Sequence, residues 1–179
     1  MKIRDFISID YQLTLPFLET DEEHLREIFY RLRQKFNFAY KRADTLIDLG
    51  AGNGKIVIYS ALRYGVKSVG LEISQNLIKE ANDKINWLKK NRKYKKRHYK
   101  KIKIKNGDLF NQSLEKFNFV YIFSLPTMQK YLKHVFKTAK KDTIFISYKY
   151  PLLNFDSFLK LEDTIYHSKK VLTKIYRKK

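Results

Sequence analysis

The chain has 179 residues, of which 44% are hydrophobic, a length and composition typical of one globular domain with a buried core. It contains no cysteine, which excludes disulfides, thiolate nucleophiles and cysteine-ligated zinc and fits a reducing compartment. A formal net charge of +20 favours acidic partners such as nucleic acid, an anionic membrane surface or acidic proteins, unless it reflects only a compositional bias toward Lys, Ile, Asn, Tyr and Phe.

The first predicted element is a helix over residues 21–41. Apolar side chains recur there every three or four residues, and acidic residues cluster at the start, where the helix dipole favours them. Thr20 or Asp21 is the expected N-cap. A short buried strand follows over residues 45–49 and leads into a glycine-rich turn, "DLGAGNG".

Strands and helices alternate through the rest of the chain. A helix after the glycine turn is expected to end at Gly65, and Ser74 is the expected N-cap of the next helix. The predicted helices cover residues 54–65, 74–90 and 127–141, and the predicted strands cover residues 67–73, 102–110, 117–125 and 143–150.

The last predicted element is a hairpin over residues 158–179, with its turn near His167–Lys169. Alternating strands and helices predict a mainly parallel sheet covered on both faces, and the hairpin adds an antiparallel strand. No repeat and no proline-rich linker divides the chain. We therefore expect one α/β domain over residues 1–179, with a Rossmann-like, doubly wound sheet of seven strands.

One segment, residues 89–101, stands apart in composition because nine of its thirteen residues are Lys or Arg. It could dock an acidic protein surface or a nucleic-acid backbone, with Tyr94 and Tyr99 as stacking partners. It could equally be a solvated helix end and loop. The sequence leaves both interpretations open.

Three of the six glycines in the chain lie in the turn after the first strand, at positions 50, 52 and 54. Their spacing is not the G-x-G-x-x-G of dinucleotide-binding turns. Gly54 and Lys55 resemble the end of a P-loop, but Ile56 replaces the hydroxyl residue and position 49 is not glycine. We therefore expect no phosphate at this turn, which leaves a purely structural turn or another ligand.

The pattern D-x-G-x-G-x-G after a first strand resembles the signature of class I methyltransferases, which use S-adenosylmethionine (SAM). Glycines let a backbone approach a ligand closely, and doubly wound sheets bind ligands at this switch point. The turn would meet the amino-acid end of SAM, and Asp48 could accept hydrogen bonds from the SAM ammonium group or from the turn's own amides. The predicted contacts of the turn are Asp48, Gly50, Ala51, Gly52, Asn53 and Gly54.

Two later acidic residues support the same resemblance. Glu72 ends the second predicted strand, where a carboxylate can accept from both ribose hydroxyls, with Ile73 beside it. By the resemblance, Asp108 binds the adenine amino group and the Leu109 amide binds a ring nitrogen. The alternatives are a simple strand-end acid and a simple Asn-Gly-Asp turn.

The chemistry is expected at the end of the fourth strand, which reads "FSLPT". Amino-methylating DNA enzymes have Asn or Asp followed by two prolines and an aromatic residue there, and that pattern is absent. The whole chain instead resembles the small seven-strand protein lysine methyltransferases. This branch includes the broad-specificity archaeal enzyme and the mitochondrial enzymes that act on the ATP synthase c-subunit and on adenine nucleotide translocase.

Several short motifs carry this resemblance. "LPFLET" places Pro16, Phe17 and Thr20 in register with a Pro-aromatic-Val-Pro-Thr motif, and the matches continue in "GKIVI", "VYIFSLPTM", "YKYPL" and "KLED". Two residues depart from the pattern. Asn53 replaces an aspartate, which should cost little because both side chains can cap the following helix. Glu19 replaces a proline, which should leave the N-terminal segment less rigid.

The resemblance implies direct methyl transfer from the sulfonium of SAM to a lysine amine. Deprotonating a lysine of pKa ~10.4 at neutral pH costs about 4–5 kcal/mol, which desolvation in an apolar channel would reduce. No base is evident, so we expect catalysis by proximity, orientation and desolvation. The residues expected around the acceptor are Thr20, Ser124, Pro126, Thr127, Tyr148 and Tyr150, and Phe17, Thr20 and Ser124 are also expected to contact SAM.

Both tyrosines could hold a methylammonium group by cation–π contact, or could simply be alternating core positions of a strand. Protein substrates bearing lysine, including acidic ones, are the expected partners, and lysine-rich tracts of the chain could be self-substrates. The alternative function is an RNA methyltransferase that holds nucleic acid with residues 89–101. A third possibility is a SAM-binding or nucleic-acid-binding protein without catalysis.

The sequence also predicts several absences. The four histidines are far apart without ligand-like spacing, so we expect no metal. The first residues show no apolar run of a signal peptide, and no stretch approaches the ~20 apolar residues of a membrane span. We therefore expect a cytoplasmic protein, and a monomer.

Overall fold

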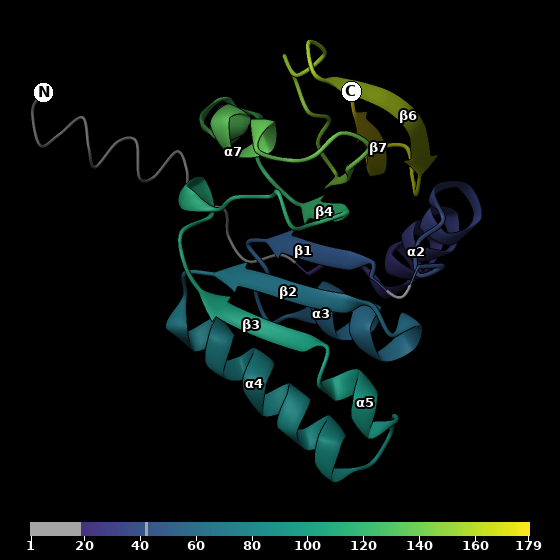
Figure 1. The fold of residues 1–179 in the computed structure, drawn as a ribbon, viewed down its shortest axis with the longest axis vertical. Coiled ribbons are helices and arrows are strands. Elements are labelled where there is room, and N and C mark those ends of the chain that lie inside the picture. Colours follow the sequence, from purple (N-terminus) through teal and green to yellow (C-terminus); the bar gives the residue numbers. More distant parts are fainter. Residues whose placement is uncertain (1–18, 42) are drawn as a thin grey trace, which may run out of the picture.

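The computed structural model describes residues 19–41 and 43–179, so Pro16 and Phe17 of the predicted N-terminal motif lie outside the described residues. Seven strands form one sheet in the order β3-β2-β1-β4-β5-β7-β6 (Figure 1). The strands are β1 Thr45–Leu49, β2 Lys67–Glu72, β3 Ile102–Asn106, β4 Phe119–Ile122, β5 Ile144–Tyr148, β6 Leu159–Tyr166 and β7 Leu172–Lys178.

The first five strands are parallel, and β7 runs antiparallel to both β5 and β6. The predicted seven-stranded, doubly wound sheet with a closing hairpin is therefore confirmed. The strand order reverses between β1 and β4, which places the switch point, where such sheets bind ligands, at the carboxyl ends of these two strands.

The helical segments cover both faces of the sheet. They are α2 Glu22–Phe36, α3 Lys55–Tyr59, η1 Ser60–Tyr64, α4 Gln75–Lys90, α5 Lys96–Tyr99, η2 Leu109–Asn111, α6 Pro126–Gln129, η3 Lys130–Leu132 and α7 Lys133–Lys137. No helix among residues 19–41 and 43–179 is long and apolar enough to cross a membrane.

The first described helix, α2, is capped as the sequence predicts. The Asp21 carboxylate accepts hydrogen bonds from the backbone amides of Glu23 (2.8 Å) and His24 (3.3 Å). The helix ends at Phe36, and Asn37 adopts a left-handed conformation with φ 54°. The predicted end at residue 41 is therefore wrong, because Asn tolerates this helix-ending conformation and the pattern of apolar residues does not reveal it.

Each face of the sheet has its own apolar core. On one face, α6, η3 and α7 pack on β1, β4 and β5 through side chains such as Leu132, Phe136 and Phe145. On the other face, α2 packs on β4, β5 and β7 through side chains such as Phe29 and Ile175. A third cluster joins η1, α4 and α5, and Figure 1 shows α4 running beside β3.

Two predicted helices have a different internal structure. The helix after the glycine turn does end at Gly65, but its second half, η1, is a π-helical segment. The region predicted as one helix over residues 127–141 is broken into α6, a 3₁₀ turn (η3) and α7, which ends at Lys137. The continuous helix is therefore wrong: a 3₁₀ turn that buries Leu132 in the core interrupts it, and local sequence periodicity does not encode such a break.

Candidate functional site

The glycine turn lies at the carboxyl end of β1 and has the open geometry that a ligand needs. Gly50 and Gly54 have φ values of 81° and 76°, which favour glycine. Among the described residues, a Cβ atom on Gly50 would meet only the Leu109 side chain, at 4.0 Å, whereas one on Gly54 would lie 3.2 Å from both Ala81 and Ile104. Gly54 therefore serves packing, and Gly50 faces space in which a ligand can approach the backbone.

Glu72, at the end of β2, holds this turn in place. Its Oε2 accepts a hydrogen bond from the Gly52 amide (2.8 Å), and its Oε1 accepts from the amides of Ile73 and Ser74 (2.9 Å each). A carboxylate has about four acceptor positions, so one is left for a ligand hydroxyl. Glu72 therefore lies where the sequence places it, and most of its acceptor capacity organises the turn itself.

Asp48, in β1, is a buried carboxylate with 3% of its surface exposed. Burial raises its pKa well above the ordinary value, and the neighbouring charge of Glu72 raises it further. It accepts no hydrogen bond from any of the described residues, so the turn amides do not satisfy it. A ligand cation, such as an ammonium group, would be its natural partner.

The predicted adenine side is more exposed. The Ile73 side chain is 70% exposed, a large apolar surface that a flat aromatic ligand could cover. Asp108 caps η2, where its Oδ1 accepts from the Phe110 amide (2.9 Å) and its Oδ2 accepts from the Asn111 side-chain amide (3.1 Å). Leu109 is half-buried beside the turn. The structural alternative for Asp108 is thus observed, and its contact with adenine stays a prediction.

Ser124 follows β4 at the switch point and is fully buried. Its hydroxyl is fully buried and has no hydrogen-bond partner among the residues that the structure describes. Such an atom calls for an explanation, and a bound ligand is a simple one. Pro126 begins α6, and both Pro126 and Thr127 are exposed at the same end of the sheet.

Thr20 and Tyr148 reach the same region from distant parts of the chain. The Thr20 hydroxyl forms a hydrogen bond with the hydroxyl of Tyr121 (2.9 Å), and the Tyr148 hydroxyl forms one with Nδ1 of His24 (2.9 Å). Burial raises the pKa of Tyr121, and the nearby Asp48 charge adds to it. The sequence did not indicate the roles of Tyr121 and His24: Tyr121 lies within the matched segment "VYIFSLPTM" but its hydroxyl contact depends on Thr20, and His24 belongs to no motif.

Asn53 behaves differently from the prediction, and Glu19 is one of its partners. Asn53 does not cap α3, whose N-cap is Gly54 without any side-chain bond; its side-chain amide donates to Glu80 (3.2 Å) and to Glu19. Glu19 also pairs with Lys55 at 3.0 Å. Burial opposes ionisation of Glu19, but these bonds outweigh it and lower its pKa. Glu19 therefore joins Asn53 and Lys55 through polar contacts, and the predicted effect of the missing proline on the residues before it lies outside the described residues.

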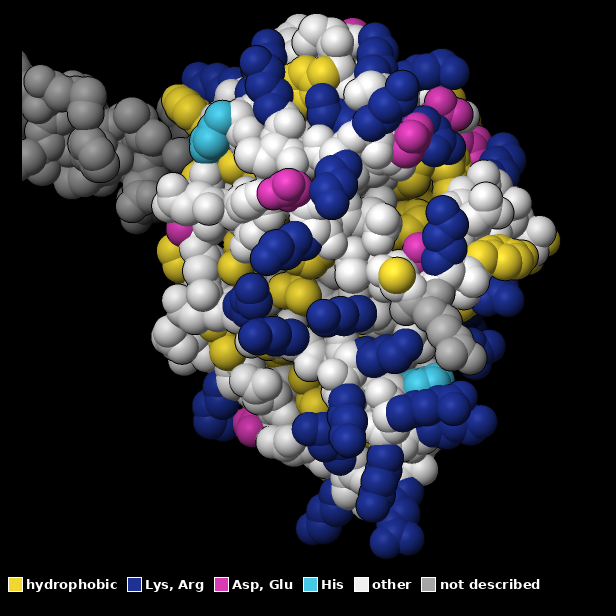
Figure 2. Space-filling view, viewed as in Figure 1, with side chains coloured by type: hydrophobic (Ala, Val, Ile, Leu, Met, Phe, Trp, Pro, Cys, Tyr) yellow, Lys and Arg dark blue, Asp and Glu magenta, His cyan; other side chains and the backbone are white. Residues whose placement is uncertain are grey.

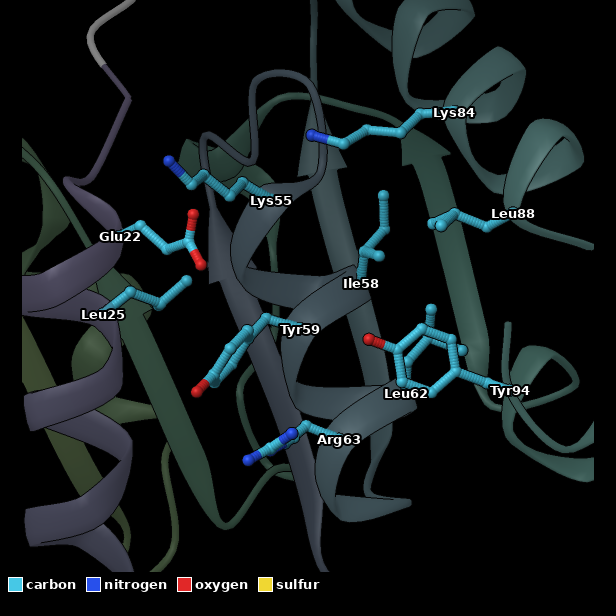
Figure 3. A pocket seen from close by; sticks show the side chains of 10 residues that line it. All are labelled: Glu22, Leu25, Lys55, Ile58, Tyr59, Leu62, Arg63, Lys84, Leu88 and Tyr94. Atoms are coloured by element: carbon cyan, nitrogen blue, oxygen red, sulfur yellow. The ribbon is translucent and has the colours of Figure 1, made fainter. Parts of the chain in front are cut away.

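A separate groove of about 150 Å³ lies on the outer side of α3, between α2 and α4 (Figure 3). Its walls are largely apolar and carry the cations Lys55, Arg63 and Lys84. None of the predicted cofactor or acceptor residues lines it. The groove therefore adjoins the glycine turn through Lys55 but is not the predicted SAM site.

Known proteins with similar sequences are lysine methyltransferases. The chain is 24% identical to the ATP synthase C-subunit lysine N-methyltransferase of Xenopus laevis over 80% of this chain and 57% of that protein. It is 25% identical to the protein of the same name from Homo sapiens over 78% of this chain and 54% of that protein. The chain thus spans a little over half the length of these two curated relatives.

Among solved structures, the fold is similar to that of an RNA methyltransferase from Salinibacter ruber in complex with S-adenosyl-L-homocysteine. The TM-score is 0.71, with 20% sequence identity over 89% of this chain and 93% of that chain. At this identity the likeness concerns the fold.

The residues at the switch point fit SAM, the cofactor of the family indicated by these likenesses. The unpartnered carboxylate of Asp48 suits an ammonium group, Gly50 leaves room above the turn, and the hydroxyl of Ser124 lacks a partner. A family profile described as the ANTKMT methyltransferase domain matches residues 48–157, more than half of the chain. On this match, the chain belongs to the ANTKMT methyltransferase domain family.

Proposed function

We propose that this protein is a SAM-dependent protein lysine N-methyltransferase. The observation that carries the proposal is the pairing, at one switch point, of a cofactor turn with an aromatic acceptor side. Asp48, Gly50 and Glu72 form the first part, and Ser124 and Tyr148 lie at the ends of the neighbouring strands β4 and β5. Membership in the ANTKMT methyltransferase domain family and the names of the two relatives support the same function.

SAM supplies an electrophilic methyl group on a sulfonium centre. On the protein side, Asp48 would bind the ammonium group of the cofactor, and Glu72 keeps the turn amides in a fixed orientation. These contacts preorganise the site, so that transfer depends on the placement of an acceptor amine rather than on rearrangement of the protein.

The acceptor side is apolar and aromatic. The ring of Phe123, which follows β4, lies edge-on to Tyr148 at 5.8 Å and is stacked on Tyr150 at 5.9 Å with an interplanar angle of 9°. Such surroundings disfavour a charged amine through desolvation and so help a lysine to lose its proton. Ring faces also attract a methylated ammonium product. We propose these rings as the binding place of the acceptor lysine.

The test is labelling of a cell extract by the purified protein with radiolabelled SAM. Protein lysines should carry the label after ribonuclease treatment, and mass spectrometry should locate it on lysine side chains. The Asp48→Asn variant is the negative control, since it should lose cofactor affinity. Label that survives protease but disappears with ribonuclease would contradict the proposal.

A second candidate function, RNA methylation, is favoured by one surface. Residues 84–105 contain twelve Lys or Arg and no Asp or Glu, and none of the twelve forms an ion pair within residues 19–41 and 43–179. Figure 2 shows Lys and Arg side chains crowded at the end of the molecule formed by α4 and α5. Such a surface suits a phosphate backbone or an acidic protein substrate. The ribonuclease arm of the labelling experiment distinguishes the two functions.

A further inference from the structure

A lysine of the chain itself lies among the aromatic rings of the acceptor side. The Nζ atom of Lys149 is 5.3 Å from the centre of the Phe123 ring and 5.7 Å from the centre of the Tyr148 ring. Both distances fall within the range of a cation–π interaction. Lys149 is half-buried and forms no ion pair with any described residue, so the rings are its recognisable partners.

The backbone at Lys149 is strained in a way that fixes this position. Its φ is 65°, a left-handed value that is uncommon for residues other than glycine. The Tyr150 amide donates a hydrogen bond to the Tyr148 carbonyl (2.9 Å), which closes a three-residue γ-turn centred on Lys149. A γ-turn whose central residue has positive φ is rare and strained. Such strain persists where the surroundings impose it and is concentrated at functional sites.

Neighbouring contacts hold the turn. The Lys149 amide donates to the Leu172 carbonyl in β7 (2.8 Å), and the Ser147 hydroxyl donates to the Tyr150 carbonyl (2.6 Å). In the parallel pair of β4 and β5, Ile122 lies opposite Ser147, so Phe123 and Tyr148 leave the sheet side by side. Lys149 is therefore presented at the carboxyl edge of the sheet, over the rings of Phe123 and Tyr148.

We propose that Lys149 is a methyl acceptor of the protein's own active site. The inference rests on the proposed function and names the aromatic group Phe123, Tyr148 and Tyr150 as the acceptor subsite. In the transfer, the lone pair of the neutral Lys149 amine forms a bond to the methyl carbon as the carbon–sulfur bond breaks. The bonding electrons pass to sulfur, which leaves S-adenosylhomocysteine, and the methylated ammonium returns its extra proton to solvent.

The matched control is another lysine that lies over a ring. Nζ of Lys130 lies 4.8 Å from the centre of the Tyr131 ring, but Lys130 is an exposed helical residue with φ −55°. It therefore shares the cation–π contact with Lys149 and lacks both the strained turn and the position at the sheet edge. The Lys149→Arg and Lys130→Arg variants both retain a positive charge, and arginine is not a substrate for transfer to a lysine amine.

The experiment is intact-mass and peptide mass spectrometry of the purified protein after incubation with SAM. We expect methyl groups on Lys149 in the wild type and in Lys130→Arg, and none at this position in Lys149→Arg. Because donor and acceptor lie in one molecule, the methylated fraction at a given time should not change when the protein is diluted about 100-fold, whereas transfer between molecules would slow with dilution.

A second readout needs no methyl transfer. A trimethyl-lysine peptide, added without SAM, should bind the acceptor rings of Lys149→Ala about 2- to 30-fold more tightly than those of the wild type, because the internal ammonium no longer occupies them. Equal affinities of the two proteins for the peptide would overturn the assignment of the subsite. An unmodified Lys149 in a wild-type sample that does label extract proteins would refute self-methylation alone. Absence of methyl groups from both Lys149 and the extract proteins would also refute the proposed function.

Discussion

Replacing Asp48 by Asn tests the cofactor site most directly, because this one change should raise the stability of the protein and lower its affinity for SAM. The carboxylate is buried without a hydrogen-bond donor among the described residues, so it destabilises the free protein and is available to a ligand cation. The amide of Asn has nearly the same shape but no charge. The Asp48→Asn variant should therefore be more stable than the wild type and should bind SAM less tightly.

The stability effect has a defined dependence on pH. Because burial raises the pKa of Asp48 above its ordinary value of 3.8, the folded protein holds this proton to higher pH than the unfolded chain does. Its contribution to the free energy of unfolding therefore becomes more unfavourable as pH rises above 3.8. The advantage of Asp48→Asn should grow with pH. Since the new amide also lacks a partner, we expect a net gain of about 1 kcal/mol near neutral pH, equivalent to about 2–4 °C in Tm.

The binding effect is larger. Losing one charge-assisted hydrogen bond costs about 1.5–3 kcal/mol, so the Kd for SAM should rise about 10- to 150-fold. Thermal unfolding between about pH 5 and pH 8 measures the first effect, and titration calorimetry with SAM measures the second. Asp44→Asn is the control, because Asp44 is also buried but accepts from the Lys41 amide (3.3 Å) away from the turn. Lower stability of Asp48→Asn at every pH, or unchanged SAM affinity, would refute the reasoning.

Three further changes have distinct expected results. Glu72→Gln removes a charged acceptor from the Gly52 amide, so calorimetry should register about 10- to 150-fold weaker SAM binding; unchanged affinity would exclude its role in the turn. Gly70→Ala places a Cβ atom 2.7 Å from the Cβ of Ala51, so urea unfolding should show a free energy of unfolding lower by about 1–3 kcal/mol. A smaller decrease would mean that the glycine turn shifts to make room for the new methyl group. Burial lowers the pKa of His167 below 6.5 despite a hydrogen bond to a carboxylate, so the folded state takes up fewer protons than the unfolded chain below that pH. In urea titrations, the stability of the wild type relative to His167→Gln should therefore fall as pH is lowered from about 7.5 to about 5.5; a difference that does not change with pH contradicts this assignment.

The fold could be predicted from the sequence because its determinants are local. The alternation of strands and helices, the caps Asp21 and Ser74 and the terminal Gly65 are all signalled by neighbouring residues, and each is confirmed. The break in the helix after β4 was not predictable in this way. Its segments pack on the core through Leu132 and Phe136, against residues far away in the sequence.

The candidate site was predictable where a motif fixes the backbone and not where side chains from distant elements meet. The glycine turn forms where the sequence places it, with left-handed conformations at Gly50, Gly52 and Gly54. The side chain of Asn53, however, contacts Glu80 in α4 and Glu19 before α2, which no local pattern indicates. The turn at Lys149 is similar: the lysine lies within the matched segment "YKYPL", but only the structure brings it over Phe123.

The contacts of α2 have a consequence for the order in which the chain folds. This helix and the residue before its cap form hydrogen bonds with β4, β5 and the C-terminal hairpin. The pairs are Thr20 with Tyr121, His24 with Tyr148 and Glu27 with His167, at sequence separations of 101, 124 and 140 residues. Contacts between residues so far apart in the sequence form slowly, whereas the contact of Glu72 with the glycine turn joins residues that are only 20 positions apart and should form sooner. We expect the cofactor half of the site to form first and the acceptor half to close late, once the C-terminal hairpin is in place.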